Sequence, residues 1–181
     1  MLDPDLPEPD TRAHTAYEGS PMIATNVSLV HFLLFLHILA ALVAFGPTFV
    51  FPLIMGMARK EPQHMAFAAK VVHTISSKVT KIGAIAAGIL GLLLIPVGGW
   101  SLKENWWLVV SLLIYMIAIV FSVVVQGPNS EKMAELLSSA TPGEAPPAEV
   151  PDLAKRLQMG GTMLGVAIIA IVLLMVFKPG S

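Results

Sequence analysis

The stretch SLVHFLLFLHILAALVAFGPTFVFPLIM, residues 28–55, contains no Asp, Glu, Lys or Arg. A helix needs roughly 20 apolar residues to cross the hydrocarbon core of a bilayer, which is about 30 Å thick. Three further apolar stretches follow at about residues 79–99, 106–126 and 160–177. The sequence therefore predicts an all-α, polytopic membrane protein, built as an antiparallel bundle of four transmembrane helices.

The composition agrees with this expectation. Hydrophobic residues make up 55% of the chain, charged residues only 13%, and the chain contains no cysteine. A soluble domain carries about a quarter charged residues. The absence of cysteine excludes disulfides and thiolate metal sites. We expect one membrane domain over residues 27–178, with no room for a sizeable soluble domain.

Residues 1–26 differ from the rest of the chain. They hold five acidic side chains and four prolines against the single basic residue Arg12. A signal peptide begins with basic residues and has a short apolar core, so this segment is not one. We expect an acidic, Pro-rich disordered tail followed by an uncleaved first helix.

The distribution of Lys and Arg predicts the orientation. Basic residues near span ends favour the cytoplasm. Eight of the eleven fall in the loops after the first and third spans, and three fall on the other side. We expect a multi-pass protein of the cell (plasma) membrane with both termini outside. Tryptophan prefers the membrane interface, and the outer rim would be marked by Trp100, Trp106 and Trp107.

A basic amphipathic helix is predicted immediately before the second span. Helical spacing places four basic side chains on one face, with apolar residues opposite: Lys70, His73, Lys78 and Lys81. One interpretation is an extension of the second span whose charges meet water. The other is a specific role at the cytoplasmic surface, such as binding lipid or a partner.

The loop between the third and fourth spans is expected to be a connector. Asn129 or Ser130 would cap a short helix through Leu137, and Asp152 would cap the helix that continues into the fourth span. Between them, residues 139–151 are rich in proline and are expected to be flexible.

Polar side chains inside the spans are the informative positions, because burying them in lipid is costly. In the first span a histidine heads a face of small residues, which let helices approach closely. The third span carries a polar stripe. We expect five polar residues in the bundle interior: His37, Thr48, Ser111, Tyr115 and Ser122.

His37 admits several interpretations. It can be a neutral imidazole hydrogen-bonded to a hydroxyl such as that of Tyr115 or Ser111. It can instead be an axial ligand of haem b, a copper ligand or a proton relay. The ten methionines, which suit copper, show no repeated Met-x-x-Met pattern. A second haem ligand would be His73, Met116, Met163 or a group on a partner subunit.

The segment HFLLFLHILAALVAFGP, residues 31–47, resembles the opening helix of the bacterial predicted integral membrane proteins known as domain of unknown function 2269. The resemblance covers residues from about 27 to 177 and implies a four-span fold. More distantly, the segment resembles the first helix of CopD-type copper-resistance proteins and of HemJ-type protoporphyrinogen oxidases. The HemJ resemblance implies haem binding at His37.

The function expected first is that of a non-catalytic four-helix membrane component or accessory subunit of a membrane complex. The alternatives are a haem b or copper redox protein using His37, and a small-solute transporter with helices interrupted at Pro47 and Pro96. Expected partners are the lipid bilayer and either membrane protein subunits or further copies of the chain, with no nucleic acid. No catalytic residue can be assigned, so an enzyme is the less favoured interpretation.

Overall fold

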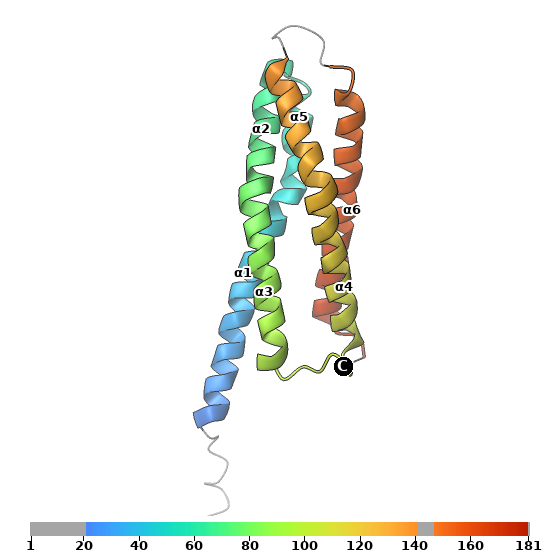
Figure 1. Cartoon of the computed structure of the whole chain (residues 1–181). Helices are drawn as coiled ribbons and strands as arrows, with labels where there is room; N and C mark the ends of the chain where they lie inside the picture. Colours follow the sequence, from blue (N-terminus) through green and yellow to red (C-terminus); the bar gives the residue numbers. More distant parts are fainter. Residues whose placement is uncertain (1–20, 141–146, 181) are drawn as a thin grey trace, which may run out of the picture.

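The computed structural model describes residues 21–140 and 147–180, which within these ranges form helices and short connections (Figure 1). Four continuous helical segments are long and apolar enough to cross a membrane, which confirms the expected all-α, four-span fold. In chain order the elements are α1 (Pro21–Ala58), the 3₁₀ turn η2 (Pro62–His64), α2 (Met65–Thr74), the π-helical segment η3 (Ile75–Thr80), α3 (Lys81–Val97), α4 (Trp106–Phe121), the π-helical segment η4 (Ser122–Gln126), α5 (Gly127–Ser139) and α6 (Val150–Phe177).

The long helices run side by side, and each π-helical segment joins two α-helices into one rod (Figure 1). α1 packs along α3, and α4 packs along α6. At the end away from the C-terminus, α2 packs against α5. The bundle is therefore two helix pairs that are joined at one end by α2 and α5.

The rods are longer than a membrane is thick. The helical segments Pro62–Val97 and Trp106–Ser139 have 36 and 34 residues, which correspond to about 50 Å at 1.5 Å per residue. About 20 residues, measured from the tryptophans, span the hydrocarbon core and reach Lys81 on α3 and Gln126 on η4. The remainder projects beyond the core, and we call it the cap: residues 59–80, 127–140 and 147–156.

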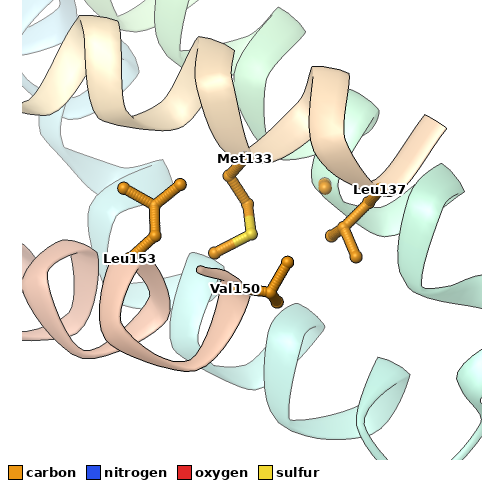
Figure 2. Close-up of a cluster of buried hydrophobic side chains, with 5 residues drawn as sticks. Met133, Leu137, Val150 and Leu153 are labelled. Atoms are coloured by element: carbon orange, nitrogen blue, oxygen red, sulfur yellow. The ribbon is translucent and has the colours of Figure 1, made fainter. Parts of the chain in front are cut away.

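The cap has its own small hydrophobic core. Met133 and Leu137 lie one turn apart on α5, and Val150 and Leu153 lie one turn apart on α6, with Ala69 of α2 completing the cluster (Figure 2). Each is at most 7% exposed. Outside the membrane, water provides the hydrophobic driving force that lipid does not. The cap is thus stabilised in the manner of a soluble protein.

The separate helix expected to begin near Asn129 is not observed. Instead, α4, η4 and α5 form one continuous helical rod, so the helix of the third span continues through this region. Pro128 stands in the first turn of α5, and the π-helical segment η4 comes immediately before it. Proline lacks an N–H and its ring clashes with the carbonyl four residues earlier. A wider turn before Pro128 accommodates that ring, so the rod continues instead of ending.

The connections also differ in extent from those expected. α5 reaches Ser139 and α6 begins at Val150, so the connection between them covers residues 140–149. It is shorter at both ends than the expected connection, residues 139–151. Residues 141–146 lie outside the described residues, as does most of the expected N-terminal tail, and α1 begins at Pro21. The interruption expected at Pro47 is wrong, because α1 is one continuous helix through Pro47 and Pro52. Pro96 lies one residue before the end of α3.

Candidate functional site

The side chain of His37 in α1 is hydrogen-bonded to the backbone of α3. Its Nδ1 lies 2.8 Å from the carbonyl oxygen of Ala87. A carbonyl only accepts, so Nδ1 carries the proton and donates it. The imidazole rests on Gly91, where a β-carbon would meet Cε1 at 3.0 Å. The partner of His37 is therefore a backbone carbonyl and not the hydroxyl of Tyr115 or Ser111 that the sequence suggested.

Tyr115 of α4 makes the matching contact from the other side. Its Oη donates a hydrogen bond to the carbonyl oxygen of Ala84, at 2.6 Å. The phenol lies over Gly88, where a β-carbon would come within 3.0 Å of Cζ and closer still to Oη. Ala84 and Ala87 lie one turn apart on α3. Two polar side chains thus bind successive turns of one helix, and each is seated on a glycine.

The other three polar residues predicted for the interior divide into two environments. Ser111 is 1% exposed, and its Oγ donates to the carbonyl oxygen of Trp107 in its own helix, at 2.7 Å. This bond satisfies the hydroxyl locally and joins no other helix. Thr48 and Ser122 instead line a cavity between the helices. Of the five predicted residues, His37 and Tyr115 are therefore the two that connect helices through side-chain hydrogen bonds.

The cavity that Thr48 and Ser122 line has a volume of about 200 Å³ and lies on the cap side of Tyr115. We call it the polar cavity. Both π-helical segments contribute polar groups to it, and Arg59 and Gln158 lie on its cap side; its polar lining consists of Thr48, Arg59, Ser76, Thr80, Ser122, Gln126, Ser130 and Gln158. Gln126 Nε2 donates to the carbonyl oxygen of Leu157, at 3.2 Å, and the amide lies over Gly160.

Two residues that line this cavity carry a buried polar atom with no hydrogen-bond partner among the described residues. The buried Oγ1 of Thr80 and Oε1 of Gln126 make no hydrogen bond among the residues described. A buried polar atom left unsatisfied costs about 1–3 kcal/mol. The cavity itself has room for several water molecules or a small polar solute.

The residues of the predicted basic face differ in what they border. His73 and Lys81 line a second cavity between α3 and α4. Lys70 and Lys78 are exposed and line neither cavity. Two of the four predicted side chains therefore border an internal space, and their role at the membrane surface stays a prediction.

The structure does not bring His37 and His73 together. His37 contacts α3 at Ala87, and His73 lies 14 residues earlier in the same rod, which is about 20 Å away along the axis. Two ligands of one metal ion each lie about 2 Å from it. Met116 and Met163 are half-exposed on the outer surface of the bundle. Within the described ranges no three His, Asp or Glu side chains are grouped as metal ligands.

Four membrane-length helices around interior polar contacts define an integral membrane four-helix protein. The chain belongs to the family described as predicted integral membrane protein (DUF2269), whose family model matches residues 31–179. No curated protein and no solved structure matches the chain. The more distant resemblance to CopD-type and HemJ-type proteins stays an expectation.

Sequence reasoning did not single out several residues that build this interior. The sequence alone did not assign Gly88, Gly91, Thr80 or Gln126 to a site. Their signal was present in the spacing, because Gln126 continues the stripe of Ser111, Tyr115 and Ser122 by one further turn. What the sequence did not indicate is that two π-helical segments face each other across a cavity.

Proposed function

We propose that this protein is a non-catalytic component of the membrane, an accessory subunit that works by holding a fixed helical surface for other molecules. The observation that carries the proposal is the pairing of His37 and Tyr115 with Ala87 and Ala84. Both side chains donate their proton to carbonyl oxygens of α3. Such interhelical bonds contribute about 0.6–2 kcal/mol each, so their role is to fix three helices relative to one another.

His37→Asn and His37→Ala test this role against haem or metal binding. The side-chain amide of asparagine can donate to Ala87 as Nδ1 does, but it has no counterpart of the imidazole Nε2. If the role of His37 is to hold α1 against α3 by this hydrogen bond, the Asn variant should keep the thermal stability of the wild type and the Ala variant should be less stable.

A redox role predicts a different pattern. Protein purified from its native membrane would show a reduced-minus-oxidised visible signal that both variants lose. His31→Ala is the matched control, because the His31 Nδ1 bonds only to the Val27 carbonyl of its own helix. A visible signal that is lost from both variants, with both still folded, would overturn the proposal that His37 serves only to hold α1 against α3.

The binding of a small polar solute within the membrane is the second candidate, and the unpaired Thr80 Oγ1 and Gln126 Oε1 favour it. Met55→Cys places a thiol in the polar cavity, which Met55 lines without lining the second cavity, in a chain that otherwise has no cysteine. A transporter predicts labelling by small polar thiol reagents from either face of the membrane. A closed structural cavity predicts labelling from neither face.

We further propose that the cap faces the cytoplasm of a plasma membrane, with the tryptophan end outside. The support is the excess of Lys and Arg in the segments that form the cap. Single cysteines at Ser138 in α5 and Ser101 after α3 test it with a membrane-impermeant reagent on intact cells. Ser101→Cys should be labelled and Ser138→Cys protected, and the opposite pattern would overturn the orientation.

A further inference from the structure

A second space, which we call the lateral groove, lies between α3 and α4 and has a volume of about 370 Å³. Its apolar wall comes from four helices and includes Phe45, Ile85, Ile119, Ile168 and Ile171. Ile85 and Val123, which border it, are about half-exposed on the outer surface. The groove therefore opens toward the surrounding lipid instead of being sealed within the bundle.

One end of the lateral groove is charged. His73, Ser77 and Lys81 line it on the side of α2, η3 and α3, and Glu131 lines it on the side of α5. The ion pairs among the described residues are His64 with Glu61 and Lys132 with Glu149. Lys81 and Glu131 belong to neither pair. An ammonium and a carboxylate thus border the same opening without neutralising each other.

The depth of these groups matches the layers of a bilayer. Lys81 lies about 20 residues from the tryptophans, at the edge of the hydrocarbon core, and Glu131 lies about one turn further out. The isoleucines of the groove lie on the hydrocarbon side of that edge. Lysine at such an edge extends its ammonium into the headgroup layer. The apolar wall therefore faces acyl chains and the charged end faces headgroups.

We propose that the lateral groove is a binding site for one phospholipid with a phosphoethanolamine headgroup. An acyl chain lies along the isoleucines, and the phosphate pairs with the Lys81 ammonium. The primary ammonium of the lipid donates to Glu131. Phosphatidylglycerol offers no cation to Glu131, and the choline headgroup has no N–H to donate. The site adds a ligand to the membrane component and does not depend on the role of His37.

Native mass spectrometry of the full chain in detergent provides the test. The protein is mixed with equal amounts of phosphatidylethanolamine, phosphatidylglycerol and phosphatidylcholine that carry the same acyl chains. We expect about threefold more bound phosphatidylethanolamine than either competitor, the scale of one exposed ion pair. Equal binding of the three lipids by the wild type would overturn the proposal.

Charge variants assign the contacts. Lys81→Gln should reduce binding of all three lipids alike, because each carries the phosphate. Glu131→Gln should retain lipid binding but remove the preference for ethanolamine. The matched controls are Lys70→Gln and Glu135→Gln, exposed charges in the same rods that line neither cavity. Controls that change lipid binding as much as the groove variants would show non-specific charge attraction and overturn the assignment.

Discussion

The imidazole of His37 rests on Gly91, so closely that a β-carbon at residue 91 would meet its Cε1 at 3.0 Å. Tyr115 has the same relationship with Gly88, one turn earlier on α3. Small residues allow transmembrane helices to approach one another. Here the approaching groups are rings, and glycine lets each ring reach a backbone carbonyl of α3. The two glycines are therefore as necessary to the interhelical bonds as the two rings.

Gly88→Ala should destabilise the bundle. The new methyl group would occupy the position of the Tyr115 Oη and break its bond to Ala84, which removes about 1 kcal/mol and adds a packing clash of about 1–3 kcal/mol. Gly46→Ala is the control, because nothing lies within 4 Å of a β-carbon there. Alanine favours a helix by about 1 kcal/mol over glycine. Thermal unfolding in detergent should move in opposite directions for the two variants.

Thr80→Val tests whether the polar cavity is occupied. Valine has nearly the shape of threonine but lacks the hydroxyl, which has no protein partner here. Removing an unsatisfied buried hydroxyl should leave unfolding unchanged or raise stability by about 1 kcal/mol. A clear loss of stability would contradict this expectation, because it would mean that the hydroxyl is bonded to ordered water or a solute.

Lys178→Gln should loosen the tryptophan end of the bundle. The Lys178 ammonium lies 5.0 Å from the ring centroid of Trp100 and 5.9 Å from that of Trp107, and it therefore connects the end of α6 with the start of α4. Cation–π contacts at exposed sites contribute about 0.5–1 kcal/mol. All three tryptophans of the chain lie at this end, so a change in tryptophan emission reports the loss. Lys178→Arg should retain the wild-type emission.

The ion pair between Lys132 and Glu149 should make the cap sensitive to acid. The Lys132 ammonium, through its hydrogen bond and its charge, holds the pKa of the exposed Glu149 carboxyl below its ordinary value. A carboxyl whose pKa is lowered on folding stabilises the fold above its unfolded pKa. That stabilisation is lost as the pH falls from about 4.3 through the lowered value.

Hydrogen exchange of the amides near Val150, measured against pH, provides the readout. The contribution of so exposed a pair is small and should fade in high salt. Glu149→Gln should abolish this part of the pH dependence. A variant with the same pH dependence as the wild type would mean that the pair does not stabilise the cap.

The number of spans follows directly from the sequence, because a membrane-length apolar stretch has few other uses in a chain. The stripe of Ser111, Tyr115 and Ser122 also follows from helical spacing. The partners of His37 and Tyr115 could not be predicted, because they are backbone carbonyls. Every residue carries one, so no pattern of side chains marks Ala84 or Ala87.

The ends of the helices were the least predictable part. Residues 127–139 are polar enough to read as a loop, and Pro128 suggests a break. What keeps them helical is burial of Met133 and Leu137 against α6, a contact between segments distant in sequence. A local pattern indicates that such a face exists but does not say whether another helix covers it.

Each of the two rods that contain a π-helical segment has one residue more than a regular α-helix would need to cover the same length. A π-helical turn arises where an extra residue enters an α-helix, so a deletion within Ile75–Thr80 or Ser122–Gln126 would restore a regular helix with both flanks still aligned. A deletion elsewhere in the same rod would turn everything beyond it by about 100° and carry Met133 or Ala69 out of the cap core. A change in chain length should thus be tolerated best at the level of the bundle where the polar cavity lies, and a deletion there would narrow the cavity as its walls regained the regular helix.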